Sequence, residues 1–586
     1  MDKLLENISF QMVYTGVCRW VLAALAVYIL ARCVVSLIRG NSSPAEVWAY
    51  LHISRYGLDK DGDVELIREN SVPITHWENV LGRSASCDIQ VDDEAVSRNH
   101  GILTRNTRGE WYYQDLGSKN GSYLEEIKIS KEGQNGPPIK MAYGDVLRAG
   151  MTEFSLLPIS LEEQNNNTAM RRSDTKMMSI GPTMAALTLF QLLTMLQLWL
   201  VLGTDHLQSL FVCIGGLMLV MWGYVALVRA SGREGFEMEA IAFFLSTLNL
   251  AVVASADPDK LYKQFFAIAL GVFVMLAMCI VLRSLETSKG LRWLLLGGAA
   301  LLLIANLALG TFGYGAKNWL AIGPVSFQPS ELVKVAFIWI GAASLDELFE
   351  KKNLWIFMGF AAFCFGCLGL MGDFGTAAIF FVTFLVISFL RSGEFSKLLL
   401  MVGTAAAGGF MILRFKPYVA KRFETWGHVW DACVMDAAGY QQTRTLSASA
   451  SGGLAGVGAG NGWLVHLPAA DTDMVFGVLI EEWGLIIAVL AVLSIVTLSV
   501  FAVRSILEGR STYYTIAACG AMSMFVFQTI LNVFGCTDIL PFTGVTFPFV
   551  SNGGTSMIVS WALLAFLKSA DTRQKASLAV KGGARS

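Results

Sequence analysis

Long apolar runs recur along this chain and restrict its fold more than any other feature. A helix needs about 20 apolar residues in succession to cross a bilayer. The stretch 13–38 meets this requirement, and from residue 180 onward similar stretches follow one another almost to the end of the sequence. Backbone polar groups must be satisfied internally in lipid, so each stretch is expected to be a helix. The chain is therefore predicted to be a polytopic α-helical membrane protein.

These runs predict about thirteen spanning helices, the first of which is an anchor. The composition agrees, since 54% of the residues are hydrophobic and only 15% are charged, against roughly 25% charged in soluble domains. The net charge of −2 gives no indication of a nucleic-acid partner. The predicted spans after the anchor are 180–202, 207–228, 236–254, 261–282, 291–309, 332–345, 354–371, 377–390, 398–413, 474–501, 513–534 and 557–567.

Basic residues predict the orientation of these helices. Arg32 and Arg39 lie at the far end of the first apolar run, whereas a cleaved signal peptide carries its positive charges before the run. We therefore expect an anchor whose N-terminus is outside, with the next segment in the cytoplasm. Continuing the alternation makes residues 414–473 an extracellular loop. That loop is basic, with Lys416 and Arg422 among its cations, and we interpret it as a surface for an anionic ligand.

Residues 44–158 differ from the rest of the chain. They are polar and rich in turn residues, with short β-type runs such as 88–91 and 111–113. Several short strands separated by turn signals are typical of a β-sandwich. The sequence therefore predicts a soluble all-β module here, followed by a polar linker.

Three motifs in this module are similar, in order and spacing, to those of the forkhead-associated (FHA) domain. They are Leu-Gly-Arg-Ser at 81–84, Val-Ser-Arg-Asn-His at 96–100 and Gly-Ser-Lys-Asn-Gly at 117–121. The arginine in the first motif provides a planar donor fork suited to phosphate. The resemblance implies binding to a phosphothreonine-containing protein, and a purely structural sandwich is the alternative. The implied phosphopeptide-binding residues are Gly82, Arg83, Ser97, Arg98, His100, Asn120 and Gly121.

Asp473 lies where a polar, glycine-rich loop meets a long apolar run. An ionisable group at a membrane boundary is a candidate functional residue, and the alternative is a solvated charge that marks the start of a helix. We expect Asp473 in the first turn of its helix, where the helix dipole favours the ionised carboxylate. Asp471 is the local competitor for the same role.

Five ordered blocks in the second half of the chain are similar to the SEDS family (shape, elongation, division and sporulation), which includes FtsW and RodA. The blocks lie at 315–334, 372–376, 439–462, 467–484 and 544–554. The resemblance implies a GT-C-like helical bundle in the bacterial cytoplasmic membrane. It also implies a peptidoglycan glycosyltransferase that uses lipid II, the undecaprenyl-diphosphate-linked disaccharide-pentapeptide, with a class B penicillin-binding protein as partner. A role in division, elongation or sporulation is left open.

In this family Asp473 corresponds to the essential carboxylate, which we interpret as the base that activates a sugar hydroxyl. Cations near the membrane surface are expected to stabilise the departing diphosphate. Glu331 and Lys334 are three residues apart on a predicted helix, so they can pair, and either a structural or a substrate-facing role is open. The expected substrate-binding residues are Gln328, Glu331, Lys334, Lys416, Arg422 and Gln442.

Other polar and sulfur-containing residues are assigned to structure. Asp373 is expected to cap or orient a helix end, and Cys364 and Cys367 are interpreted as packing residues. The sequence contains no cluster of metal ligands, although Mg²⁺ or Mn²⁺ bridging the diphosphate stays open.

Two other functions remain alternatives: a lipid II flippase, and an FHA-bearing membrane scaffold for cell division or shape proteins. They would share the same organisation. The predicted organisation is an anchor at 1–43, a cytoplasmic FHA domain at 44–158, a linker at 159–178, two extra helices at 179–230, a SEDS membrane domain at 231–570 with an extracellular loop at 414–473, and a cytoplasmic tail at 571–586.

Overall fold

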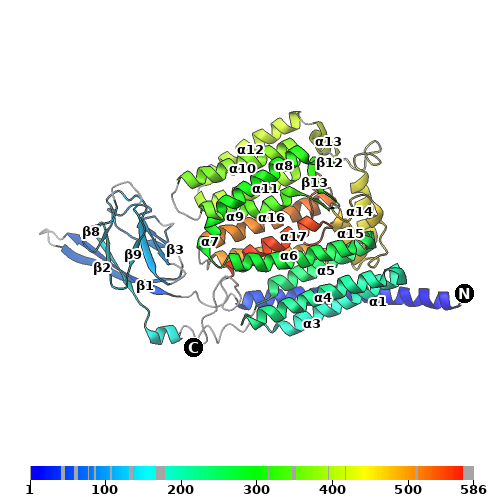
Figure 1. The fold of residues 1–586 in the computed structure, drawn as a ribbon, viewed down its shortest axis with the longest axis horizontal. Coiled ribbons are helices and arrows are strands. Elements are labelled where there is room, and N and C mark those ends of the chain that lie inside the picture. Colours follow the sequence, from blue (N-terminus) through cyan, green and yellow to red (C-terminus); the bar gives the residue numbers. More distant parts are fainter. Residues whose placement is uncertain are drawn as a thin grey trace.

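The computed structural model describes residues 2–571 with short gaps. Within the described residues, an all-β module is inserted between helix α1 (Asp2–Gly40) and a large helical body (Figure 1). The predicted combination of a β-sandwich with a helical membrane domain is confirmed. The gaps lie at 41–46, 59–63, 77, 85–86, 106–108, 131–135, 167–177, 234, 314–315, 324, 346–350, 393–394, 416 and 508–511.

The β module is a sandwich of two sheets. One sheet has the strand order β2-β1-β11-β10-β7-β8, and the other has the order β4-β3-β5-β6-β9. Alternate residues of the strands, among them Trp111, Tyr113 and Phe154, fill the space between the sheets. The strands are β1 (Ala49–Leu58), β2 (Val64–Ile74), β3 (Glu78–Gly82), β4 (Ile89–Gln90), β5 (Gly101–Arg105), β6 (Trp111–Asp115), β7 (Tyr123–Leu124), β8 (Ile127–Lys128), β9 (Ile139–Met141), β10 (Val146–Ala149) and β11 (Thr152–Leu157).

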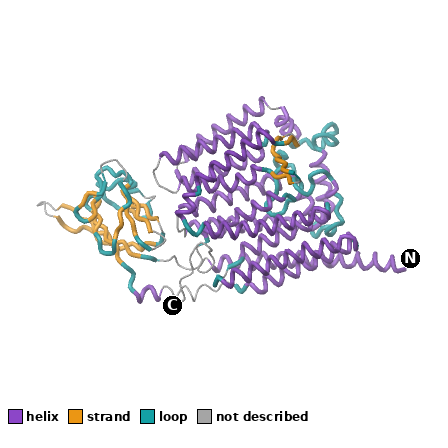
Figure 2. The backbone as a smooth tube through the Cα atoms, in the orientation of Figure 1, coloured by secondary structure: helices purple, strands orange, loops and turns teal. Residues whose placement is uncertain are grey.

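Helices make up most of the remaining described chain (Figure 2). A small three-stranded sheet interrupts them, formed by β12 (Thr311–Gly313), β13 (Ala316–Ile322) and β14 (Val325–Phe327). The helices after the β module are α3 (Ile180–Leu202), α4 (Leu207–Ala230), α5 (Glu237–Ala256), α6 (Leu261–Val281), α7 (Leu285–Gly290), α8 (Arg292–Leu309), α9 (Pro329–Leu345), α10 (Lys351–Met371), α11 (Phe374–Ser392), α12 (Phe395–Phe415), α13 (Pro417–Thr425), α14 (Tyr440–Gly452), α15 (Val475–Leu507), α16 (Thr512–Cys536) and α17 (Gly554–Ala570).

Nine helices within the described part of the chain are long and apolar enough to cross a membrane. α9 has only 17 residues, and the apolar parts of α11, α12 and α17 are also short, at Phe374–Leu390, Leu398–Phe410 and Gly554–Ala570. The predicted count of thirteen spans therefore stays a prediction. α5 is buried along its whole apolar length, between the layer formed by α1, α3 and α4 and the helices α6 and α15. The β module lies at one end of the helical body, while β12, β13, α13 and α14 lie at the opposite end (Figure 1).

α15 is broken near its start, and a glycine-rich loop fills the break. Gly484 has φ +83°, and a Cβ there would lie 2.4 Å from the carbonyl oxygen of Leu454. Only glycine fits this backbone without strain. The loop satisfies groups freed by the break, since Val457 N–H donates to the Glu481 carbonyl at 2.8 Å and Leu485 N–H donates to the Gly453 carbonyl at 3.0 Å. The predicted span 474–501 is therefore a discontinuous helix whose first segment begins beside Asp473.

Candidate functional site

A cavity of about 360 Å³ opens at the end of the helical body that carries β13 and α13. Its lining comes from segments far apart in the sequence: the strand and helix ends around 316–334, the start of α11, and the loops that precede α15 and α17. The polar residues that line it include Asn318, Gln328, Glu331, Lys334, Asp373, Arg422, Asp471, Asp473, Thr543 and Asn552.

Asp473 lies in a turn immediately before α15. Its backbone N–H donates to the Ala469 carbonyl at 2.9 Å, and α15 begins two residues later at Val475. The prediction that Asp473 occupies the first helical turn is therefore wrong. The turn places the carboxylate against Gly544, where an added Cβ would lie 3.1 Å from Asp473 Oδ2.

Removal from water raises the pKa of Asp473 to about 6. A hydrogen bond with Thr472 and the Arg422 charge lower this pKa, whereas the carboxylates of Asp471 and Asp373 raise it. We expected the helix dipole to favour the ionised form, but the dominant effect is desolvation, which favours the neutral form. A carboxylate with this pKa is a stronger base than an ordinary aspartate and is still ionised at neutral pH.

Unlike the carboxylate of Asp473, that of Asp471 forms a short hydrogen bond with a neighbouring loop. Its Oδ2 accepts a hydrogen bond of 2.6 Å from Asn552 Nδ2, and its carbonyl accepts the Asn552 N–H at 2.8 Å. Ser551 Oγ donates to the Thr472 carbonyl at 2.5 Å. These contacts tie the turn that carries Asp473 to the loop before α17.

Glu331 and Lys334 form the predicted pair, with Lys334 Nζ 2.6 Å from Glu331 Oε1. Both side chains line the cavity, and that of Lys334 is only 1% exposed. A buried charge requires a partner of opposite sign, which explains the pairing, and the position in the cavity also allows contact with a ligand.

Asp373 organises the neighbouring wall. Its Oδ1 accepts the Thr376 N–H at 3.1 Å, as expected for a residue that caps α11. Its Oδ2 accepts from Gln328 Nε2 at 3.2 Å and from Asn318 Nδ2 at 3.4 Å. The predicted residue Gln328 is thus brought to the cavity through Asp373.

The remaining predicted substrate residues have different positions. Arg422 is exposed, lines the cavity, and donates from Nη1 to the Thr543 carbonyl at 3.4 Å. Gln442 is buried and does not line the cavity; its Nε2 donates to Asp538 Oδ1 at 3.3 Å. Lys416 lies outside the described residues. The sequence interpretation missed Asn552, although the block 544–554 that contains it was recognised.

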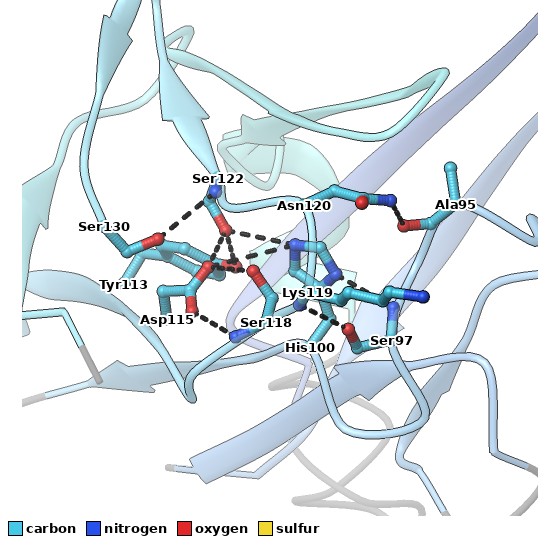
Figure 3. A network of polar contacts seen from close by, with 10 residues as sticks. All are labelled: Ala95, Ser97, His100, Tyr113, Asp115, Ser118, Lys119, Asn120, Ser122 and Ser130. Atoms are coloured by element: carbon cyan, nitrogen blue, oxygen red, sulfur yellow. Dashed lines mark hydrogen bonds and ion pairs between the residues drawn. The ribbon is translucent and has the colours of Figure 1, made fainter. Parts of the chain in front are cut away.

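The β module carries a second polar site, built from the three loops that hold the recognised motifs. Figure 3 shows residues from two of these loops, among them Ser97 and Asn120. Ser97 Oγ accepts the Lys119 N–H at 2.9 Å, and Asn120 Nδ2 donates to the Ala95 carbonyl at 2.7 Å. These bonds join two of the loops. Gly121 has φ +77°, which favours glycine in the turn after Asn120.

His100 is buried beneath the loops of this site and supports them through hydrogen bonds. Its Nδ1 accepts the Ser97 N–H at 3.1 Å, so its Nε2 carries the proton and donates to Ser122 Oγ at 3.1 Å. Ser122 Oγ in turn donates to Asp115 Oδ2 at 2.5 Å (Figure 3). Burial lowers the pKa of His100, which keeps the ring neutral.

The residues expected to meet a phosphate lie at the rim. Arg83 follows β3 and Arg98 lies on the facing loop, and both side chains are exposed. The Arg83 N–H donates to the Ser97 carbonyl at 3.0 Å. A Cβ at Gly82 would lie 2.3 Å from the Arg98 carbonyl oxygen, so glycine allows the two loops to approach. The structure therefore brings all seven predicted residues to one site.

No group of three or more His, Cys, Asp or Glu side chains suited to a metal ion occurs among the described residues. The possible Mg²⁺ or Mn²⁺ stays a prediction.

The fold and the two sites describe a multi-pass membrane protein that also carries a β-sandwich domain with a polar site in its loops. The family model for the cell cycle proteins FtsW, RodA and SpoVE matches residues 240–576, and the FHA model matches residues 79–150. The chain belongs to the FtsW/RodA/SpoVE family and carries an FHA domain. Both parts of the predicted resemblance are confirmed.

Three comparisons describe the similarity. The chain is 31% identical to the probable peptidoglycan glycosyltransferase FtsW of Pseudoalteromonas atlantica, over 56% of this chain and 71% of that protein. It is also 31% identical to the protein of the same name from Escherichia coli O6:H1, over 58% of this chain and 87% of that one. A chain of a solved peptidoglycan synthase complex is 24% identical, with 58% of this chain and 97% of that chain covered and a TM-score of 0.48.

Proposed function

We propose that this protein is a peptidoglycan glycosyltransferase that polymerises lipid II. The observation that carries the proposal is the cavity in which Asp473, with its raised pKa, lies beside Arg422 and the buried pair of Glu331 and Lys334. A base and cations in one partly enclosed site suit the transfer of a sugar from a diphosphate. The FtsW relatives bear the name of this activity.

The proposed reaction needs one proton transfer. The Asp473 carboxylate removes the proton from an acceptor hydroxyl, whose oxygen forms a bond to the anomeric carbon of the donor sugar. As this bond forms, the bond between the anomeric carbon and the diphosphate oxygen breaks. The electron pair of the broken bond stays on undecaprenyl diphosphate, which leaves. Arg422 and Lys334 would stabilise the negative charge of this leaving group. A diphosphate needs little help from a general acid.

We further propose that the cavity faces outward and the FHA domain faces the cytoplasm. The placement of the two sites at opposite ends of the helical body supports this orientation, as does the distribution of basic residues. The predicted domain division from the anchor at 1–43 to the tail at 571–586 is kept as part of the proposal. A class B penicillin-binding protein is the proposed partner on the outer side.

The FHA domain is proposed to bind a phosphothreonine-containing protein and so to regulate or localise the polymerase. Arg83, Ser97 and Asn120 are the proposed contacts. Arg83→Ala is expected to weaken binding of a phosphothreonine peptide by about 10- to 100-fold, because a charge-assisted bond is lost. Arg68→Ala, which removes an exposed charge from β2, is the matched control and should leave the affinity unchanged.

The activity is tested with purified full-length protein, its cognate class B penicillin-binding protein and fluorescent lipid II. Wild type should produce glycan polymer, and Asp473→Asn should lower the rate by at least about 10²-fold. Asp431→Asn is the control, since it removes an exposed carboxylate from the same outer loop without touching the cavity. Full activity in Asp473→Asn would refute the assigned base. Movement of lipid II across liposomes without any polymer would instead favour the flippase, and neither activity would favour the scaffold.

A further inference from the structure

Asn532 connects two loops that form one side of the cavity. It lies on α16, and its Nδ2 donates to the Asp473 carbonyl at 2.9 Å and to the Val545 carbonyl at 2.8 Å. The residue is only 2% exposed. Since Asp473, Gly544 and Val545 all line the cavity, one amide group fixes the spacing between the turn that carries the carboxylate and the loop that faces it.

The orientation of this amide is fixed by its surroundings. If the amide were flipped, Oδ1 would face two carbonyl oxygens, which are also acceptors. In the observed orientation Oδ1 is buried and has no hydrogen-bond partner among the described residues. An unsatisfied polar atom in a membrane helix is unfavourable, and a leucine of similar size would avoid that cost. The two donated hydrogen bonds, rather than packing, therefore explain why an asparagine occupies this position.

The other contacts to this turn do not replace Asn532. Ser551 and Asn552 hold Thr472 and Asp471, the two residues before the carboxylate. The Asp473 carbonyl also accepts a hydrogen bond from Cys536 Sγ at 3.4 Å. A thiol is a weak donor, so the amide of Asn532 is the strong contact at Asp473.

We propose that Asn532 is a positioning residue that directs the Asp473 carboxylate into the cavity. The inference rests on the proposed function of Asp473 as the base. With the carbonyl of Asp473 fixed, rotation of the residue within its turn is restricted and the carboxylate stays opposite Gly544. The same bond to Val545 prevents the facing loop from moving away. Asn532 acts on the reaction through Asp473 and does not itself contact the substrate.

The test compares Asn532→Leu with wild type in the full-length protein, using lipid II polymerisation and thermal unfolding. We expect kcat to fall by about 10- to 100-fold, because a displacement of about 1 Å in a reacting group has effects of this size. KM for lipid II should stay within about threefold, since the substrate contacts are kept.

Gln191→Met is the matched control. Gln191 is a fully buried amide on α3 whose Nε2 donates to Thr247 Oγ1 at 3.1 Å, away from the cavity. It should lower the unfolding temperature to a similar extent and leave kcat unchanged.

The kinetic constants of the two variants distinguish a positioning role of Asn532 from a structural or substrate-binding role. An Asn532→Leu protein whose kcat stays within twofold of wild type would overturn the inference, as would an equal loss of kcat in Gln191→Met. A rise in KM with constant kcat would assign Asn532 to substrate binding and also overturn it. Absence of polymer from wild-type protein that shows a cooperative thermal unfolding transition would refute the proposed function itself, and the positioning role with it.

Discussion

Two carboxylates separated by one residue have different surroundings in the cavity. Asp471 accepts a short hydrogen bond from Asn552, whereas the Asp473 carboxylate lies against Gly544 and its pKa is raised by desolvation. Such a difference in environment is how a protein assigns different roles to like residues. Asp471 is suited to hold the loops together, and Asp473 is suited to accept a proton.

The pH dependence of polymerisation follows from this pKa. A base must be ionised, and Asp473 is ionised above about pH 6 rather than above its ordinary value of 3.8. We expect kcat/KM to be constant above pH 7 and to fall about tenfold for each unit below pH 6. Initial rates between pH 4.5 and about pH 8 would measure this limb. A constant rate down to pH 5 would contradict the raised pKa.

Gly544 provides a second test at the residue scale. Gly544→Ala would strain a backbone with φ +69° and place a Cβ 3.1 Å from Asp473 Oδ2. Displacement of the carboxylate should reduce polymerisation by at least about tenfold. Gly427→Ala is the control, because its φ is +76° and an added Cβ meets nothing within 4 Å. An equal loss of activity in both variants would show that backbone strain alone accounts for the effect, and full activity in Gly544→Ala would contradict the prediction.

The sequence predicted several members of the cavity and missed others for a physical reason. Glu331 and Lys334 stand out because charges in an apolar run need an explanation. Asn532 and Asn552 do not stand out, since a single amide carries no charge pattern, and their partners lie 59 and 81 residues away. Gln442 was assigned to the substrate from its motif, but its buried contact with Asp538 depends on tertiary structure.

At the scale of elements, the broken helix α15 is the feature least accessible to sequence analysis. The apolar run after Asp473 predicts a helix, and Gly484 looks like an ordinary small residue in it, as does Gly477. The loop that fills the break does so with backbone groups, as in the bond from Gly458 N–H to the Glu482 carbonyl at 2.9 Å. Backbone hydrogen bonds have no side-chain signature, so only the glycine-rich composition of the loop indicates a close approach.

Gly484→Ala tests this element. The added Cβ would meet backbone at 2.4 Å and the residue would keep φ +83°, so we expect a loss of about 2 kcal/mol or more in the free energy of unfolding. Thermal unfolding in detergent would detect it. Gly366→Ala on α10 is the control, because nothing lies within 4 Å of the added Cβ and alanine favours a helix. Equal stability of both variants would contradict the role given to the break.

At the scale of the whole molecule, α1 connects the two ends. Near its C-terminus Ser36 Oγ donates to Glu237 Oε1 at 2.6 Å, and Arg32 Nη2 donates to the Ser179 carbonyl at 2.8 Å. Near the middle of α1, Arg19 Nη1 donates to the Gly456 carbonyl at 3.0 Å, in the loop that fills the break in α15. The layer outside the family match is thus bonded to the helical body at two separate points along α1.

The proposed orientation can be tested with the protein's own cysteines. Cys433 is exposed in the loop at the cavity end, and Cys87 is partly exposed in the FHA domain. A membrane-impermeant maleimide should label Cys433 in intact spheroplasts and Cys87 only in inverted vesicles. Cys433→Ser and Cys87→Ser variants identify each labelled site. The reverse pattern would overturn the orientation, since the two residues belong to opposite ends of the molecule.

The short connection between α1 and the β-sandwich has a consequence for recruitment. Only residues 41–48 separate Gly40 from Ala49, which limits the reach of that tether to about 30 Å. In the proposed orientation, this reach keeps the FHA domain close to the cytoplasmic face of the membrane rather than in the bulk cytosol. In that arrangement, a phosphorylated segment on a neighbouring membrane protein would meet the domain at high effective concentration, so that even weak affinity would give high occupancy. A freely diffusing phosphoprotein would gain no such advantage.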